Sequence, residues 1–314
     1  MRKILVTGAL GQIGSELTTA LIEHYGENRV LATDIREPGK DCDCQWALLD
    51  VTDSRRVADI VRDHKIGTIY HLAALLSAVA EKKPQQAWQV NISGLYNVLE
   101  VAREFGCAVF TPSSIGAFGP NTPPVTTPQD TIQRPTTMYG VTKVAGELLC
   151  DYYFNRYKVD TRGLRYPGIV SHKTPPGGGT TDYAVDIYYQ AVREKRYTCF
   201  LKDGTYLDMM YMPDAISGAI QLMEADPTRL IHRNAFNVTA MSVGPEMLAA
   251  SIRKHIPQFE IIYDVDPARQ AIADSWPDSI DDSAAREEWD WQPEYDLERM
   301  TIDMLNHLRE KLMA

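Results

Sequence analysis

The chain has 314 residues, of which 44% are hydrophobic and 24% are charged. This ordinary globular composition excludes the disordered, collagenous and fibrous classes of protein. The 42 acidic residues outnumber the 32 Lys and Arg residues, and the formal net charge of -10 argues against nucleic acid and anionic membranes as partners. No apolar run approaches the roughly 20 residues that span a bilayer, and the scattered cysteines lack the spacing of a disulfide framework or a metal site. Met1-Arg2-Lys3 leads directly into the first expected strand, so we expect no leader peptide and a reducing cytoplasm as the compartment.

The N-terminal stretch has the pattern of a phosphate-binding turn. Three glycines, Gly8, Gly11 and Gly14, follow a short apolar run, and residues 12–25 then show helical periodicity. Glycine lets the backbone approach a pyrophosphate closely, and the start of a helix offers unpaired N–H groups and a positive dipole end. The second expected strand ends on Asp34, about 20 residues after Gly14, where a carboxylate accepts hydrogen bonds from ribose hydroxyls and repels a 2′-phosphate. The sequence therefore predicts NAD rather than NADP as the cofactor.

Strands and helices alternate through the first half of the chain. The apolar patterns predict strands over residues 4–6, 29–33, 45–49, 68–72, 107–111 and 161–166, and helices over 12–25, 55–64 (capped by Ser54), 84–105 and 139–157. This alternation predicts an α/β fold with a doubly wound (Rossmann) parallel sheet. Ligands on such sheets lie at the carboxyl ends of the strands, so we place Asp50, Val51 and Leu72-Ala73-Ala74 beside the adenine and the centre of the cofactor.

The composition changes after the sixth expected strand. Residues 167–179 hold prolines and glycines in place of a helix, which indicates an exit into a smaller C-terminal substrate lobe. We therefore expect an NAD-binding Rossmann domain over residues 1–170, with returning segments near 214–255. Residues 171–213 and 256–314 would form the lobe. Its expected elements are a helix over 181–193 and short strands near 199–201 and 206–211.

One pair of residues supplies the expected chemistry. Tyr139 and Lys143 stand one helical turn apart, so both lie on the same face of helix 139–157. A phenolate stabilised by a fixed positive charge can take a proton from an alcohol at neutral pH. Ser113-Ser114 follows the fifth expected strand, at the same sheet edge as the glycine turn, so Ser114 can hydrogen-bond the substrate oxygen. With a bound nucleotide, these groups predict oxidation of an alcohol by NAD.

With these motifs the chain resembles the extended short-chain dehydrogenase/reductase family, which includes nucleotide-sugar epimerases and dehydratases. The resemblance covers nearly the whole chain and extends to Asn91 and to the segments 164–167 and 289–297. It implies that Tyr139 is the base, that Lys143 holds the nicotinamide ribose and that Ser114 orients the substrate hydroxyl. The cofactor-binding residues implied by the motifs and the resemblance are Gly8, Gly11, Gln12, Ile13, Gly14, Asp34, Asp50, Val51, Leu72, Ala73, Ala74, Asn91, Tyr139, Lys143 and Tyr166.

Within this family, the segments 112–119, 177–189 and 205–213 are similar to the epimerase-like L-threonine 3-dehydrogenases. That similarity implies oxidation of the L-threonine β-hydroxyl to 2-amino-3-oxobutyrate, with Tyr139 as the base and NAD⁺ as the hydride acceptor. Residues 177–181 would supply backbone N–H groups and hydroxyls suited to the substrate carboxylate. The expected substrate-binding residues are Ser77, Ser114, Tyr139, Gly179, Thr180 and Trp276.

Two other functions stay open at this point. A nucleotide-sugar 4-epimerase or dehydratase would retain NAD tightly, but the stretch 180–215 offers few cations for a diphosphate. A dinucleotide-sensing or scaffold protein would need none of Ser114, Tyr139 and Lys143. Release of free NADH during turnover separates a dehydrogenase from both.

The sequence also predicts an assembly. Residues 84–105 carry two apolar stripes, and a helix that is apolar on two faces is buried twice. We expect this helix and helix 139–157 to pair with their mates as a four-helix bundle in a homodimer.

Overall fold

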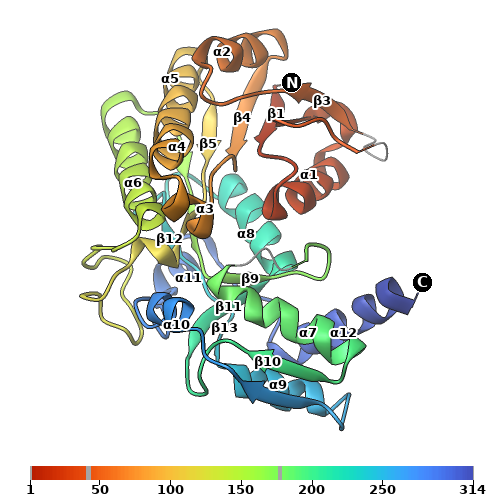
Figure 1. Ribbon diagram of the computed structural model, residues 1–314. Coiled ribbons are helices and arrows are strands. Elements are labelled where there is room, and N and C mark those ends of the chain that lie inside the picture. Colours follow the sequence, from red (N-terminus) through yellow and green to blue (C-terminus); the bar gives the residue numbers. More distant parts are fainter. Residues whose placement is uncertain (1, 40–43, 176–178, 314) are drawn as a thin grey trace. The chain divides into compact units, whose positions relative to one another are not determined.

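The structure is a computed structural model that describes residues 2–39, 44–175 and 179–313 (Figure 1). The chain divides into two compact units, and each unit is assembled from three segments. The first unit takes Met1–Ala117, Pro135–Arg165 and Ile216–Phe236, and the second takes Phe118–Arg134, Tyr166–Ala215 and Asn237–Ala314.

A six-stranded parallel sheet forms the centre of the first unit, in the order β3-β2-β1-β4-β5-β7. Its strands are β1 (Lys3–Thr7), β2 (Val30–Asp34), β3 (Gln45–Leu48), β4 (Ile66–His71), β5 (Ala108–Phe110) and β7 (Thr161–Arg162). The strand order reverses between β1 and β4, which is where doubly wound sheets bind their ligands. The predicted α/β Rossmann fold is therefore confirmed.

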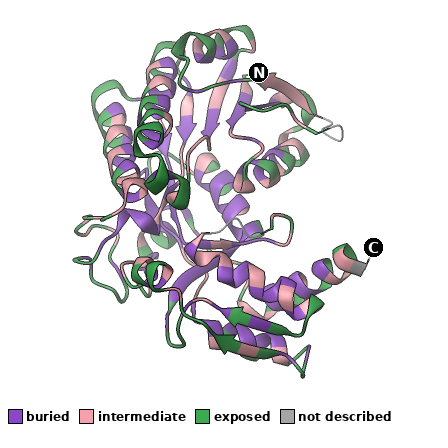
Figure 2. Ribbon diagram, viewed as in Figure 1, coloured by how far each residue is buried: buried purple, intermediate pink, exposed green. Residues whose placement is uncertain are grey.

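Helices cover both sides of this sheet (Figure 1). The helices of the first unit are α1 (Gln12–Tyr25), α2 (Ser54–Asp63), α3 (Ser77–Lys82), α4 (Pro84–Trp88), α5 (Leu95–Phe105), α6 (Met138–Tyr157) and most of α8 (Met212–Glu224). Side chains of α2, α5 and α6 share one core with the sheet, including Val57, Leu99 and Tyr153. Figure 2 shows the strands buried between helices whose outer faces are exposed.

Local signals account for several helix boundaries. Helix α1 starts directly after Gly11, and α6 starts after Thr137, whose side chain accepts a hydrogen bond from the Gly140 N–H. The predicted cap of α2 was wrong by one position, because Asp53 rather than Ser54 accepts the bond from the Arg56 N–H. Carboxylate and hydroxyl caps are equally suitable, so the sequence did not discriminate between the two neighbours.

The predicted continuous helix over residues 84–105 was wrong. The structure has α4, then a π-helical segment over Gln89–Gly94, then α5. Gly94 lies against Val51, where a β-carbon would come within 2.8 Å of Val51 Cγ2. The wide turn also carries Asn91, and π segments of this kind are frequent at functional sites.

The predicted sixth strand is also interrupted. Residues 161–166 form β7 and β8 (Leu164–Tyr166), separated by Gly163. The carbonyl of Thr111 occupies the position that a β-carbon of Gly163 would take, so the segment between β5 and β6 passes close to the backbone of Gly163. Strand β8 lies between β6 (Ser113–Ser114) and β12 (Phe236–Asn237) in a small sheet of its own.

The second unit has a separate core. Its strands are β9 (Gly168–Val170), β11 (Leu207–Tyr211) and β13 (Met241–Val243) in one sheet, and β10 (Arg196–Cys199) and β14 (Glu260–Tyr263) in another. Its helices are α7 (Tyr183–Arg193), α9 (Pro245–Arg253), α10 (Pro267–Ala273), α11 (Ser283–Trp289) and α12 (Leu297–Met313). Helices α7, α9 and α12 pack on one another around Tyr188, Leu248 and Met304.

Some expectations for this part of the chain need correction. The strand expected near 199–201 ends at Cys199, and β9 lies within the stretch that was expected to be irregular. The segments 118–134 and 237–255 cluster with the second unit rather than with the nucleotide-binding domain. The reason is packing: α9 lies on α7, and Thr127 bridges to Ile280.

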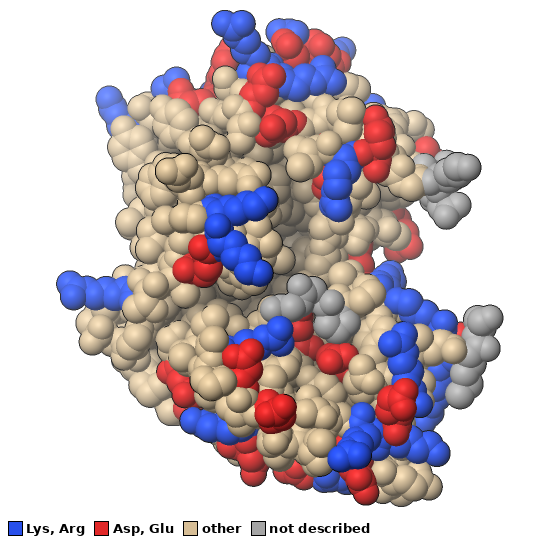
Figure 3. Space-filling view, viewed as in Figure 1, with Lys and Arg blue, Asp and Glu red and all other residues tan. Residues whose placement is uncertain are grey.

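The surface of the molecule carries mixed charge. Figure 3 shows Lys and Arg side chains interspersed with Asp and Glu on the face that it draws. Among the described residues, no helix is both long and apolar enough to cross a membrane. The four cysteines in the described parts of the chain are free thiols.

Candidate active site

The glycine turn between β1 and α1 has the shape that a dinucleotide requires. Gly14 lies so close to the Gly8 carbonyl that a β-carbon at position 14 would overlap it. No side chain caps α1 at Gly11, so the first N–H groups of the helix, at Gln12 and Ile13, face the turn with the positive end of the helix dipole. These residues fit the pyrophosphate of NAD, because the narrow turn and the uncapped helix start both favour an anion.

Asp34, the residue predicted to bind the adenosine ribose, is fixed by a hydrogen bond to the glycine turn. It ends β2, is 7% exposed, and its Oδ2 accepts a bond of 3.1 Å from the Leu10 N–H in the glycine turn. Its Oδ1 lies 3.2 Å from Arg36 Nε, while the Arg36 side chain is 63% exposed. The carboxylate is thus fixed beside the turn, as the sequence predicted for recognition of NAD.

The strand ends that were expected to line the cofactor site come together in the first unit. A β-carbon on Gly8 would stand 2.8 Å from the Ala73 nitrogen, and Leu72 donates its N–H to the Thr7 carbonyl. Val51 is buried, whereas Asp50 is exposed and accepts bonds from the Thr52 N–H and hydroxyl.

The predicted catalytic residues Tyr139 and Lys143 lie on α6, which meets the segment after β6. The Gly116 carbonyl occupies the place of a β-carbon on Gly140, so the start of α6 packs directly on this segment. A β-carbon on Gly116 would lie 3.2 Å from two ring carbons of Tyr139 and 3.5 Å from Ser114 Oγ. Tyr139 and Ser114 therefore flank the same point. Gly116 had no predicted role, although its place in the Ser113–Gly119 stretch was a signal for close backbone approach.

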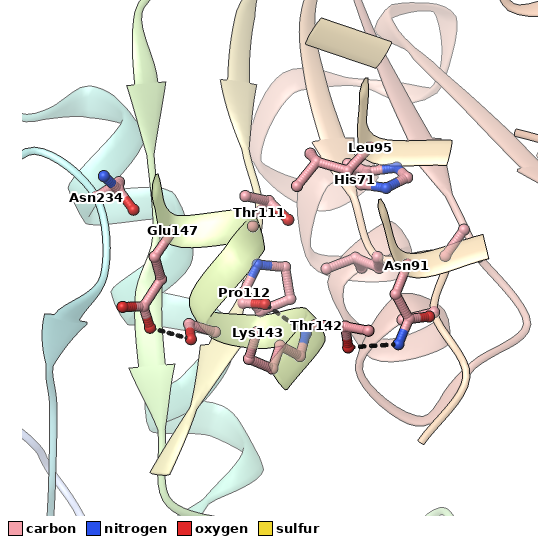
Figure 4. Close-up of a pocket in the computed structure, with 14 residues that line it drawn as sticks. His71, Asn91, Leu95, Thr111, Pro112, Thr142, Lys143, Glu147 and Asn234 are labelled. Carbon is pink, nitrogen blue, oxygen red and sulfur yellow. Dashed lines mark hydrogen bonds between the residues drawn. The ribbon is translucent and has the colours of Figure 1, made fainter. Parts of the chain in front are cut away.

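Lys143 lies one turn further along α6. Its ammonium is 5.4 Å from the centre of the Tyr139 ring and donates a hydrogen bond of 2.7 Å to the Pro112 carbonyl (Figure 4). The positive charge is thus fixed between the ring and the end of the fifth strand.

Asn91 joins three parts of the site. Its Oδ1 accepts a bond of 2.7 Å from the Leu75 N–H, and its Nδ2 donates to the Leu75 carbonyl and to Thr142 Oγ1. Thr142 in turn donates to the Tyr139 carbonyl. Asn91 was predicted to bind the cofactor; in the structure its side chain bonds to the loop after β4 and to α6.

A cavity of about 30 Å³ lies beside these groups. Figure 4 draws its lining, which includes His71, Asn91, Lys143 and Glu147. His71 Nδ1 lies 2.9 Å from Thr7 Oγ1, and burial, together with the nearby Lys143 charge, lowers the pKa of His71 to about 3. The imidazole is therefore neutral at physiological pH.

An ion pair that was not predicted from the sequence lies one helical turn beyond Lys143. Glu147 and Arg165, whose side chains are 6% and 8% exposed, are 2.9 Å apart, and Ser113 donates its hydroxyl proton to Glu147. Glu147 continues the four-residue spacing of Tyr139 and Lys143, which was the available signal.

The expected substrate residues divide between the units. Ser77 is half-buried at the start of α3, which packs on α6 in the first unit. Gly179, Thr180 and Trp276 belong to the second unit, where α10 packs beside the turn formed by Thr180–Asp182. Gly177 and Gly178 lie outside the described residues.

Tyr166 also belongs to the second unit. Its ring is 3% exposed and its hydroxyl donates to the Ala215 carbonyl. Burial raises the pKa of this phenol. The structure thus buries Tyr166 at the end of β8, with its hydroxyl engaged by a backbone carbonyl.

Comparison with known proteins identifies the family of the chain. The model of the NAD dependent epimerase/dehydratase family matches residues 4–239. An uncharacterized epimerase/dehydratase of Staphylococcus saprophyticus is 58% identical over 317 aligned positions, which cover 100% of this chain and 99% of the relative.

Two solved structures are similar over nearly the whole chain. The L-threonine dehydrogenase of Clostridium difficile is 58% identical with a TM-score of 0.98, covering 100% of this chain and 99% of the other. The holo form of the GalE-like L-threonine dehydrogenase of Cupriavidus necator is 52% identical with a TM-score of 0.95, covering 98% and 99%. The chain therefore belongs to the NAD-dependent epimerase/dehydratase family of extended short-chain dehydrogenases/reductases, and its cofactor is NAD.

Proposed function

We propose that the protein is an NAD-dependent L-threonine 3-dehydrogenase, which oxidises the β-hydroxyl of L-threonine to 2-amino-3-oxobutyrate. The observation that carries the proposal is the convergence of Tyr139 and Ser114 on one point beside Gly116, with the Lys143 ammonium 5.4 Å from the Tyr139 ring. The similarity to two L-threonine dehydrogenases, at 58% and 52% identity, supports the choice of substrate.

Each residue of this group has a defined task. The Tyr139 phenolate accepts the proton of the β-hydroxyl, and the Lys143 ammonium stabilises the negative charge of that phenolate. The Ser114 oxygen already accepts a bond of 3.1 Å from the Gly116 N–H, so its own proton is left to bind the substrate oxygen. NAD, when bound, supplies the acceptor for the hydride that leaves the β-carbon.

The second unit would supply recognition of the amino acid. Thr180 is buried at the start of a short helical turn, and the Gly179 N–H donates to Asp182 with a bond of 2.8 Å. Trp276 follows α10 and packs against the core of this unit. A hydroxyl and an indole suit a small zwitterion better than a sugar diphosphate, which requires several cations.

The test is to mix the purified protein with NAD⁺ and L-threonine and to follow the absorbance of NADH. We expect NADH to accumulate with L-threonine and NAD⁺. We expect no reduced cofactor in the control cuvettes, which contain L-serine with NAD⁺ or L-threonine with NADP⁺. Absence of NADH release, with NAD retained by the protein after purification, would instead favour a nucleotide-sugar epimerase or dehydratase.

We also propose a homodimer. The outer faces of α4, α5 and α6 expose Trp88, Tyr96, Val141, Leu148 and Tyr152, although these are large apolar or aromatic side chains. Neighbouring helices with an exposed apolar face are suited to pair with a second copy as a four-helix bundle.

A further inference from the structure

Helix α6 carries a third functional position on the face of its catalytic pair. Tyr139, Lys143 and Glu147 follow one another at intervals of one helical turn, so their side chains leave the same side of the helix. Glu147 is 6% exposed and lines the cavity beside Lys143 (Figure 4). A buried carboxylate is stable only with strong partners.

The partners of Glu147 are on the other side of the catalytic segment. Arg165 of β8 donates from Nε to Oε1 at 3.0 Å and from its terminal nitrogen to Oε2 at 2.9 Å, which is the two-pronged geometry of a strong ion pair. Ser113 of β6 donates its hydroxyl proton to the same Oε1. The carboxylate thus ties α6, β6 and β8 together.

Three consecutive residues are held in this way. The Pro112 carbonyl accepts from Lys143, the Ser113 hydroxyl donates to Glu147, and the Ser114 oxygen accepts from the Gly116 N–H. Successive side chains of an extended segment point to opposite sides, so a partner behind Ser113 sets the direction in which Ser114 faces the substrate. The carbonyl that holds the Lys143 ammonium belongs to the residue directly before Ser113.

Burial of a charged pair is poor evidence of a role in stability. Replacing such a pair with apolar side chains is often neutral or stabilising, because both charges lose their hydration. A buried pair that also bonds to a catalytic segment contributes in another way, because it holds that segment in one position.

We propose that Glu147 and Arg165 are a positioning pair for the reaction, which fixes residues 112–114 and through them Ser114 and the Lys143 ammonium. In this role neither residue acts on the substrate directly. The inference deepens the proposed function, since it assigns the support of the same Ser114, Tyr139 and Lys143 group.

The experiment compares two variants of the pair with a matched control. Glu147→Gln retains the acceptor for Ser113 and removes the charge opposite Arg165, while the double variant E147M/R165M removes both charges. Asp160→Asn is the control, because Asp160 pairs with the buried Arg162 and with Arg233 in the same unit. For each variant we would measure the melting temperature, the dissociation constant of NADH by fluorescence, and kcat per NADH-binding site across pH.

We expect both pair variants to lower kcat per site by about 100-fold, because small displacements of catalytic groups have effects of this size. We also expect a displaced pH profile and an NADH dissociation constant raised about tenfold through the loss of the Lys143 position. E147M/R165M should regain the melting temperature of the wild type and stay slow. Asp160→Asn should lose thermal stability and keep its kcat, pH profile and NADH affinity.

Recovery of kcat together with melting temperature in E147M/R165M would overturn the proposal, since a purely structural pair predicts that result. So would an unchanged pH profile and NADH affinity in both pair variants. A wild-type protein that binds NADH and leaves L-threonine unoxidised would refute the proposed function alone. The NADH affinities of the same variants would then decide the positioning role.

Discussion

The Gly116 carbonyl lies in the space that a β-carbon of Gly140 would occupy. This contact seats the first turn of α6 on the segment that carries Ser114. It brings the ring of Tyr139 against Gly116, so the geometry of the proposed active site depends on the absence of one methyl group.

Gly140→Ala should therefore displace Tyr139. Because the added β-carbon meets a backbone carbonyl, which cannot move aside as a side chain does, we expect a loss of about 1–3 kcal/mol in stability and at least a tenfold lower kcat. Gly26 is unsuitable as a control because its φ is positive, so Gly39→Ala is the control: none of the described residues lies within 4 Å of the position of its β-carbon. Thermal melts and NADH production measure both effects, and a fully active Gly140→Ala enzyme would contradict this account of the contact.

Tyr139→Phe should abolish the proton transfer. Loss of a general base lowers kcat by about 10²–10⁴-fold, while NADH affinity should stay within about twofold of wild type. Tyr152→Phe removes a hydroxyl from the exposed side of the same helix and should leave both quantities unchanged. Steady-state kinetics and NADH fluorescence give the comparison; equal kcat for the two variants would exclude Tyr139 as the base.

Asp34→Asn should weaken the preference for NAD over NADP. Removal of the carboxylate removes the repulsion of a 2′-phosphate, and the exposed Arg36 guanidinium beside it is then free to attract that group. We expect the kcat/KM with NAD⁺ divided by the kcat/KM with NADP⁺ to fall by about 10–100-fold. Asp59→Asn, on the surface of α2, should leave the ratio as it is. An unchanged ratio in the Asp34 variant would mean that another group selects the cofactor.

His71 should make the first unit sensitive to acid. The His71 pKa is lowered from 6.5 to about 3, so below pH 6.5 the unfolded chain binds a proton that the folded chain does not. Stability due to this residue is therefore present above pH 6.5 and decreases as the pH falls towards 3, by about 2 kcal/mol at pH 5. His71→Gln removes this titration, so the difference in unfolding free energy between the two proteins should change with pH in denaturant melts. If the unfolding free energies of the two proteins changed with pH in parallel, His71 could not be neutral and buried in the folded protein.

Leu148→Glu should dissociate the proposed dimer. Leu148 is 62% exposed in the centre of α6, and a charge there cannot be buried against a second copy without a large desolvation penalty. Ile231→Glu is the matched control, because Ile231 is 82% exposed on a different segment of the same unit. Sedimentation at micromolar concentration should report a dimer for the wild type and the control and a monomer for Leu148→Glu. A monomeric wild-type protein would refute the proposed dimer.

The parts of the fold that the sequence predicted well are those in which neighbouring residues carry the signal. Helix α1 begins and ends at the predicted residues, and β2 ends on Asp34 as expected, because the glycine turn, apolar periodicity and strand end are all local. The same reasoning placed Tyr139 and Lys143 on one face of α6.

Features that depend on distant residues were not predictable in this way. The π segment at Gln89–Gly94 reflects the contact of Gly94 with Val51, and strand β9 exists because it pairs with β11, whose register joins Gly168 to Met209. Likewise, the ion pair of Glu147 and Arg165 joins residues 18 positions apart, and neither position shows its partner.

The arrangement of the first unit in three chain segments has a consequence for biosynthesis. Its last segment, Ile216–Phe236, contributes the buried Ile220 and Leu222 of α8. A ribosome must therefore translate all three segments before the nucleotide-binding unit can close. Until then the nascent chain leaves apolar surface open to chaperones, although the glycine turn has already been made.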